Sequence, residues 1–187
     1  MSEPIMFFIE RTMRQRHRLT RINQDDESPV LSGNGLLLKV LTHSDANAFF
    51  DLYSCLDMHN ASWSPTIKAR ETQERFAERI VSACEMIWTI RLAESPDAII
   101  GDCALHHWNR PTNEMELGGS LLPAFWGHGI MATAFPLVSA FAKNVYGVNT
   151  LKCTTSIANH RAIRFAEKMG FKRLTGSKSA ITFSKEL

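Results

Sequence analysis

The sequence predicts one mixed α/β (α+β) domain in which helices pack on the faces of a sheet. Short apolar runs typical of strands alternate with longer amphipathic segments typical of helices. Three strand-like runs near the middle follow one another with only short turns between them, which indicates an antiparallel meander. After this meander the order changes to helix, strand, helix, an alternation that places helices against a mixed sheet.

Size and composition are those of an ordinary globular protein. The chain has 187 residues, enough for one packed core but few for two, and we place the domain at 31–187 behind an extension at 1–30. Hydrophobic residues make up 44% and charged residues 21%, the usual balance for such a domain. The net charge of +2 is too small to indicate a nucleic-acid partner, and no apolar run approaches the ~20 residues that span a bilayer.

The N-terminal extension carries a cluster of arginines with no acidic residue between them. Its members are Arg11, Arg14, Arg16, Arg18 and Arg21. Three acidic residues follow at 25–27, so the charges of the segment largely cancel. Two interpretations remain open: an arm that binds a partner or RNA, and a solvated extension without a partner.

The cysteines predict a reduced protein. They are Cys55, Cys84, Cys103 and Cys153. Their spacing matches neither a redox pair nor a zinc site, and each has apolar neighbours, so we expect buried structural thiols and no bound metal. The first residues lack the basic-then-apolar order of a secretory signal, and we therefore expect a cytoplasmic protein.

The first half of the domain reads as a strand followed by two helices. The strand is predicted at 36–40, and Thr42 or Ser44 then caps a helix. The apolar stripe of this helix is Ala46, Phe49, Phe50, Tyr53 and Leu56. After a loop at 57–70, a second helix is predicted at 71–84.

The second half begins with the meander and ends with a hairpin. Strands are predicted at 86–92, 98–106 and 116–122. The later elements are a helix at 130–144, a strand at 150–157, a helix at 160–169 and a closing hairpin with strands at 171–174 and 180–183. Gly170 suits the end of the second helix, whereas Pro136 lies inside the first and should kink it.

A glycine turn joins the third meander strand to the next helix. It reads Trp126-Gly127-His128-Gly129-Ile130. Glycines let the backbone turn sharply and approach a ligand, and the first amides of the helix lack partners within it, so the turn is suited to an anion. A purely structural turn is the alternative. The pattern is neither a dinucleotide fingerprint nor a Walker A loop.

Two longer stretches carry a family resemblance. Residues 116–129 read Glu-Leu-Gly-Gly-Ser-Leu-Leu-Pro-Ala-Phe-Trp-Gly-His-Gly, and residues 159–171 read Asn-His-Arg-Ala-Ile-Arg-Phe-Ala-Glu-Lys-Met-Gly-Phe. Together they resemble the GNAT superfamily of acetyl-CoA-dependent N-acetyltransferases, in the branch that contains the ribosomal-protein N-acetyltransferases. The resemblance implies a mostly antiparallel central sheet with helices on both faces and a splayed pair of strands that binds acetyl-CoA.

The same resemblance implies where the cofactor lies. The pantetheine arm would fill the gap between strands 116–122 and 150–157, facing the backbone of Leu121 and Leu122. Asn159 would contact the arm, cap its helix, or do both. The pyrophosphate would lie on the amides of Trp126, Gly127, His128, Gly129, Ile130 and Met131.

For the chemistry, Glu116 is the candidate general base, and a surface glutamate at a strand end is its alternative. Glu114 and Asp102 are weaker candidates. His106 and His107 are adjacent, so a regular strand would point them to opposite faces, with one of them toward the substrate.

The proton donor to the leaving thiolate is less defined. Ala162 and Ala166 occupy positions where relatives often carry a hydroxyl. Ser120, Tyr146 and Cys153 are the candidates that remain, beside water.

Two departures from the family pattern bear on the site. Met131 is bulkier than the residue usually found there and is expected to crowd the loop. Gly119 and Ser120 replace a Tyr-Trp pair, which would widen the acceptor side.

The resulting hypothesis is an N-acetyltransferase that transfers acetyl from acetyl-CoA to a primary amine, either a protein N-terminus or a small amine. A catalytically weak acyl-CoA-binding module is the alternative, and a ribosome- or RNA-associated partner protein is the third possibility. We expect a monomer or homodimer with no membrane partner.

Overall fold

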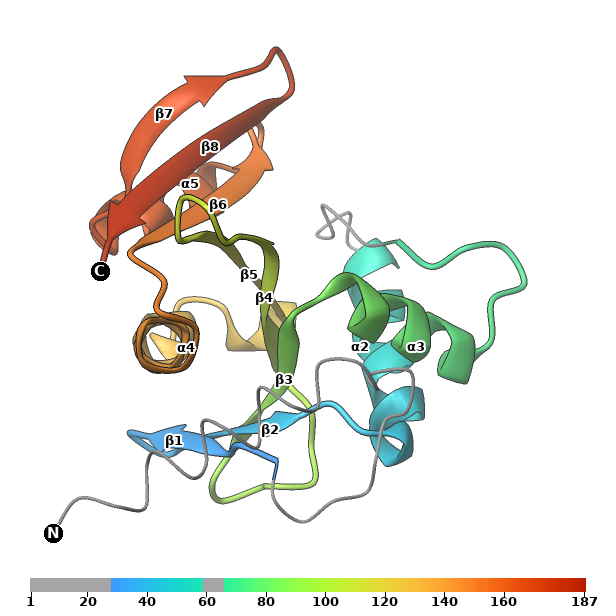
Figure 1. The fold of residues 1–187 in the computed structure, drawn as a ribbon. Helices are drawn as coiled ribbons and strands as arrows, with labels where there is room; N and C mark the ends of the chain where they lie inside the picture. The colour runs from blue at the N-terminus through green and yellow to red at the C-terminus, as the bar shows by residue number, and fades with distance from the viewer. Residues whose placement is uncertain (1–27, 59–65) are drawn as a thin grey trace, which may run out of the picture.

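The computed structural model describes residues 28–58 and 66–187, and these form an eight-stranded sheet with helices on both faces (Figure 1). In chain order the elements are β1 (Leu31–Gly33), β2 (Leu36–Val40), α2 (Ala46–Met58), α3 (Gln73–Ala83), β3 (Met86–Leu92), β4 (Gly101–Asn109), β5 (Glu114–Leu121), α4 (Ile130–Tyr146), β6 (Thr150–Ser156), α5 (His160–Lys168), β7 (Lys172–Gly176) and β8 (Ala180–Glu186). The arginine cluster of the extension lies outside the described residues.

The strand order confirms the predicted sheet. It runs β1-β2-β3-β4-β5-β6-β8-β7, and among the described strands every neighbouring pair is antiparallel except β5 and β6. The predicted meander corresponds to β3, β4 and β5. After β5 the sheet continues with β6, β8 and β7, next to α5 (Figure 1).

Two apolar clusters, one on each face, hold the helices to the sheet. On one face the aromatic rings of Phe49, Tyr53 and Phe76 pack together between α2 and α3, with centroids 5.1–5.6 Å apart. On the other face α4 buries its apolar stripe, including Ala134 and Val138, against β2, β4 and β5. Figure 1 shows α2 and α3 on the opposite side of β3 from α4.

A β-hairpin at the start of the domain was missed in the sequence prediction. Asn34 and Gly35 adopt positive φ angles of 46° and 77°, and this tight turn pairs β1 with β2. Asn-Gly is the strongest two-residue hairpin signal, because both positions of such a turn need positive φ. The first strand therefore begins at Leu31 rather than at Leu36.

Other element boundaries also differ from prediction by a few residues. The second meander strand begins at Gly101 instead of residue 98, because the carbonyls of Pro96 and Asp97 accept hydrogen bonds from the buried guanidinium of Arg91 and so belong to a turn. The helix predicted at 130–144, with Pro136 inside it, extends two residues further as α4, to Tyr146. Thr42 makes the contact expected of a cap: its amide donates to the Asp45 carboxylate at 3.0 Å.

Arg91 anchors this corner of the domain. Its guanidinium is buried, forms an ion pair with Asp45 and donates to Thr89 Oγ1 at 3.0 Å. Removing one member of a buried ion pair leaves the other charge without compensation. We expect Arg91→Ala to lower the free energy of unfolding by about 3–5 kcal/mol. Urea denaturation would measure this, with the exposed pair in Arg173→Ala as the control, since loss of that contact costs at most about 1 kcal/mol.

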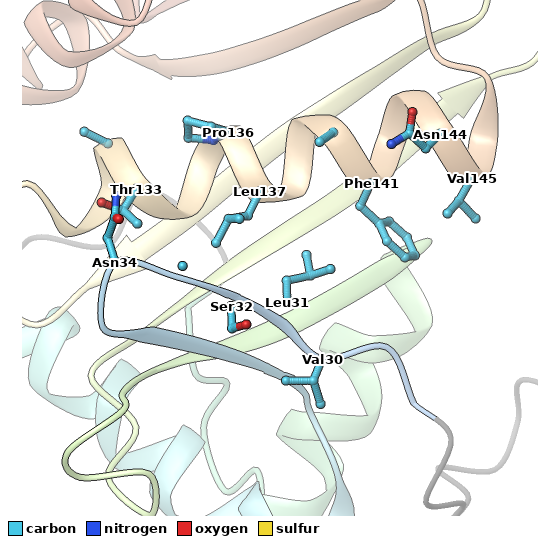
Figure 2. A pocket seen from close by; sticks show the side chains of 13 residues that line it. Val30, Leu31, Ser32, Asn34, Thr133, Pro136, Leu137, Phe141, Asn144 and Val145 are labelled. Atoms are coloured by element: carbon cyan, nitrogen blue, oxygen red, sulfur yellow. The ribbon is translucent and has the colours of Figure 1, made fainter. Parts of the chain in front are cut away.

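A groove of about 630 Å³ lies between β1 and α4 (Figure 2). Leu31 on the strand and Pro136, Leu137 and Phe141 on the helix line it. None of the residues expected to contact acetyl-CoA lines this groove, so the candidate site is elsewhere. Within the described residues, no helix is long and apolar enough to cross a membrane.

Candidate active site

The parallel strands β5 and β6 separate after a very short ladder. Their register pairs Glu114 with Thr150 and ends where Glu116 pairs with Lys152. Beyond that pair β5 continues to Leu121 and β6 to Ser156 without pairing to each other. Beyond the ladder, the inner backbone groups of β5 and β6 do not pair with each other, so they can bind an extended ligand, apart from the Leu121 carbonyl, which accepts from Trp126.

The backbone groups that face this gap follow from the alternation of a strand. The amide of Leu122 donates to the Ile100 carbonyl at 2.9 Å, so it points toward β4 and away from the gap, contrary to the expectation for Leu122. Since successive backbone groups alternate between neighbours, the amides of Leu117, Gly119 and Leu121 point toward β6. Leu117 and Gly119 were not among the predicted cofactor residues, although their spacing from Leu121 could have indicated them.

The glycine turn follows the end of β5 that is not paired with β6. Gly127 and Gly129 have φ angles of 84° and 79°, and a Cβ placed on either would meet no atom within 4 Å. The helix ladder of α4 begins with the Thr133 amide, which donates to the Gly129 carbonyl at 3.1 Å. The amides of Ile130 and Met131 precede that bond and point out of the helix end, where an anion is favoured.

Trp126 connects the turn to both sides of the gap. Its indole Nε1 donates to the Leu121 carbonyl at 2.7 Å, and the guanidinium of Arg161, on α5, stacks over its ring at 4.5 Å. The tryptophan therefore fixes the turn relative to β5 and α5. Asn159 caps α5, with its side chain accepting from the Ala162 amide at 3.0 Å, which confirms the capping role among the two considered.

Met131 and Gly119 fit against each other. A Cβ on Gly119 would lie 2.7 Å from Met131 Cε, so the methionine occupies the space that a side chain on Gly119 would fill. Gly119 therefore faces α4, and its missing side chain does not widen the acceptor side, contrary to the expectation for the Gly119–Ser120 pair. The bulk of Met131 is accommodated by the missing side chain on β5.

Glu116 lies at the point of separation and contacts two histidines. His107 Nδ1 lies 3.1 Å from Glu116 Oε2, and His106 Nδ1 lies 3.5 Å from the same oxygen. The prediction that the histidines point to opposite faces was wrong. A register shift between His106 and Asn109, with His107 at φ 53°, breaks the alternation and brings both rings to the carboxylate.

The other carboxylate at this end of β5 is held by a lysine. Glu114 Oε2 accepts from Lys152 Nζ at 2.8 Å, and this hydrogen bond lowers the pKa of Glu114. A carboxylate with a lowered pKa is a poorer proton acceptor, so Glu116 is the better base candidate of the two. Burial lowers the pKa of His106, an effect that Glu116 opposes and His107 reinforces.

A buried polar cluster lies at the other end of the same face of β5. Tyr53 Oη donates to Asp102 Oδ1 at 3.2 Å and lies 3.4 Å from Ser120 Oγ. Burial raises the pKa of Asp102 to about 7, although hydrogen bonds from Tyr53 and Ser120 act in the opposite direction. Ser120 thus has a carboxyl partner that is partly protonated near neutral pH.

This raised pKa predicts a pH-dependent stability. Because the folded pKa of Asp102 lies above its usual 3.8, the protonated carboxyl favours the folded state below about pH 4, and this contribution is lost as the pH rises to about 7. The loss is on the order of 4 kcal/mol at most. We expect the urea midpoint of the wild type to gain this contribution between pH 7.5 and pH 4.5, and the midpoint of Asp102→Asn to lack it. Parallel pH profiles for the two proteins would contradict this.

The remaining proton-donor candidates are less suitable. Tyr146 Oη donates to the Glu85 carbonyl at 3.4 Å, away from the gap. Burial, followed by the charge of Glu116, raises the pKa of the Cys153 thiol to about 12, which makes it a weak acid. Cys55, Cys84, Cys103 and Cys153 form no disulfide with one another. Cys103 is fully buried as expected, whereas the other three are partly exposed.

Known proteins share this fold. The family model described as acetyltransferase (GNAT) domain matches residues 35–172. An uncharacterized N-acetyltransferase, YoaA of Bacillus subtilis, is 21% identical over 149 residues, which covers 78% of this chain and 84% of YoaA. The structure of ribosomal-protein-S5-alanine acetyltransferase from Vibrio fischeri has a TM-score of 0.72 at 17% identity, with 84% of this chain and 96% of that chain covered.

A third relative has been solved with a ligand. RimL, a ribosomal L7/L12 α-N-protein acetyltransferase in complex with coenzyme A, has a TM-score of 0.69 at 11% identity, with 85% of this chain and 98% of that chain covered. These structures share the fold. The family model spans most of the chain, including β5, the glycine turn and α5. The chain therefore belongs to the GNAT family of acetyltransferase domains and is an N-acetyltransferase.

Proposed function

We propose that the protein transfers the acetyl group of acetyl-CoA to a primary amine by direct attack of the amine on the thioester. The observation that carries this proposal is the separation of β5 and β6 next to the N-terminus of α4, where Met131 meets Gly119 of β5. The gap offers strand amides to an extended arm, and the helix end offers amides to phosphate. Acetyl-CoA contains both an amide-bearing arm and a pyrophosphate.

In this proposal each part of the cofactor has a partner. The pantetheine arm bonds to the amides of Leu117, Gly119 and Leu121, and the pyrophosphate lies on the amides from Gly127 to Met131. His128 adds a donor beside the phosphates. Asn159 keeps its side-chain oxygen on the helix cap and can offer only its NH₂ group to the arm.

The chemistry uses the two polar groups on the acceptor face of β5. Glu116 accepts the proton of the attacking amine as the nitrogen–carbon bond forms. The carbon–sulfur bond then breaks, and the Asp102 carboxyl is the acid that protonates the thiolate through the Ser120 hydroxyl, which passes one proton on as it receives another. Glu116 and Ser120 are four residues apart on one face, about 13 Å along the strand. The His106 ring covers Gly118 between them, where a Cβ would lie 3.2 Å from His106 Nε2, so the amine approaches beside this ring.

The acceptor that fits best is an α-amine. Deprotonating an α-amino group at pH 7 costs only about 1 kcal/mol, whereas a lysine costs between about 4 and 5 kcal/mol. Glu116 is the one base that we assign, which favours the easier substrate. Two similar structures are named for acetylation of ribosomal-protein N-termini, so a protein N-terminus is the first acceptor class to test, with small amines second.

Coenzyme A release with an acceptor panel tests this function. The panel contains peptides with a free α-amine, α-acetylated peptides with a lysine, polyamines and amino sugars. We expect release with the free α-amine peptides first. Tight coenzyme A binding without turnover on any acceptor would instead support an acyl-CoA-binding module, which the missing hydroxyls at Ala162 and Ala166 favour.

A further inference from the structure

Three side chains at the end of the β5–β6 ladder direct their ligand atoms at one point. They are His106 and His107 on β4 and Glu116 on β5, and their nitrogen and oxygen atoms lie within 4.8 Å of one another. The nearest atoms form a triangle: His106 Nδ1 to His107 Nδ1 is 3.2 Å, His107 Nδ1 to Glu116 Oε2 is 3.1 Å, and His106 Nδ1 to Glu116 Oε2 is 3.5 Å.

This triangle has the dimensions of a tetrahedral metal site. Nitrogen and oxygen ligands lie about 2.0–2.1 Å from Zn²⁺, so two ligands of a tetrahedron are about 3.3 Å apart. Two imidazoles and one carboxylate form a ligand set that suits Zn²⁺, while Mg²⁺ and Ca²⁺ require more oxygen atoms. Since His107 is exposed, the fourth position opens to solvent.

Hydrogen bonds among the three side chains cannot satisfy all three of these atoms at once. Each neutral imidazole carries one proton, and the carboxylate carries none. If His107 Nδ1 is protonated, its single N–H can donate to Glu116 or to His106, but not to both. If it is not protonated, its lone pair faces the carboxylate at 3.1 Å. Lys152, which pairs with Glu116 in register, donates to Glu114 instead. A cation at the centre would engage all three atoms.

The backbone is shaped to produce this convergence. His106 pairs directly with Glu116 across the strands, and the bulge after it turns His107 back to the same carboxylate. The φ of 53° at His107 is unfavourable for a residue with a Cβ, by about 1–3 kcal/mol. Such local strain persists where the surrounding structure enforces it, and it is common at ligand sites.

We propose that His106, His107 and Glu116 bind one Zn²⁺ ion with an open fourth position. The ion binds the carboxylate oxygen with which Glu116 accepts the amine proton, so bound zinc inhibits acetyl transfer. The binding stands on the ligand geometry alone, and only the inhibition rests on the proposed function.

A zinc titration of the full chain against a chromophoric chelator tests the binding. We expect one tight equivalent in the wild type and an affinity at least about 100-fold lower in His107→Asn. Asparagine tolerates positive φ, so this variant keeps the bulge. The matched control is His43→Ala, which removes an exposed histidine from the turn before α2 and should bind as the wild type does. Equal affinity in His107→Asn and the wild type would overturn the site.

The second measurement is coenzyme A release with and without zinc, expressed as a ratio within each protein. We expect zinc to reduce the wild-type rate at least about tenfold, a chelator to restore it, and the ratio in His107→Asn to stay near one. Zinc that binds without slowing turnover would overturn the inhibition while leaving the metal site in place. An absence of turnover with intact zinc binding would count against the proposed function only.

Discussion

Gly129→Asp should abolish coenzyme A binding and leave the protein folded. The φ of 79° at Gly129 is one that aspartate tolerates better than most residues, and its Cβ would meet no protein atom within 4 Å. The new carboxylate would therefore enter the space proposed for the pyrophosphate. Two like charges about 4 Å apart near a protein surface repel by about 4 kcal/mol, which corresponds to roughly a thousandfold weaker binding.

The controls for this variant separate charge, strain and helix stability. Gly129→Asn has the same shape without the charge, so it should lose much less affinity. Gly147→Asp places the same carboxylate at the other end of α4, also at positive φ and in open space, and should bind coenzyme A normally. Calorimetric titration and circular dichroism measure the two properties. Retained affinity in Gly129→Asp would show that the phosphates lie elsewhere.

Glu116→Gln should lower kcat by between about 10² and 10⁴ while leaving coenzyme A affinity unchanged. The amide cannot accept the proton of the amine, yet it keeps the size of the carboxylate beside His106 and His107. Because Glu116 is not among the residues that face the pyrophosphate, the cofactor should bind as before. Steady-state kinetics with a free α-amine peptide and a binding titration would measure both effects.

The neighbouring glutamate supplies a matched control for that experiment. Glu114→Gln removes a carboxylate two residues away on the same face of β5, but one already bound to Lys152. We expect kcat to change by less than about threefold, as for a partly exposed ion pair. Equal losses in the two variants would show that general charge near the gap matters, and would remove Glu116 from its role as the base.

Local sequence patterns predicted most of the helices and strands, because hydrophobic periodicity and capping residues depend only on residues close together in the chain. The helix and strand sequences around Phe49 and Trp88 needed no tertiary information. The hairpin at Asn34 and Gly35 was also readable, since that dipeptide demands a tight turn. The splay of β5 and β6 was different: no periodicity encodes where two strands part, and the expectation came from the family resemblance of 116–129 and 159–171.

The errors in the site arose where strand alternation or side-chain packing depends on distant residues. A regular strand separates His106 from His107, and the bulge that unites them is decided by pairing with β5. Likewise, Met131 was expected to crowd the loop, but its methyl group occupies the space that a side chain on Gly119 would fill. Asp102 was a weaker base candidate by sequence, and its contact with Tyr53, distant in the chain, is a property of the folded core.

The short ladder between β5 and β6 also links cofactor binding to the stability of the fold. Among the described residues, β6 is joined to the rest of the sheet by the short ladder from Glu114 to Glu116 and by bonds from the amides of Asn149 and Thr150 to the Asn113 carbonyl. Side-chain contacts such as Phe135 with Phe165 add to these bonds. An arm bound along the gap would complete the missing hydrogen bonds on both sides, as an additional strand does. By linkage, cofactor at 100 times its Kd would add about 2.7 kcal/mol to the unfolding free energy. The lifetime of the protein in a cell would then follow the supply of its own substrate.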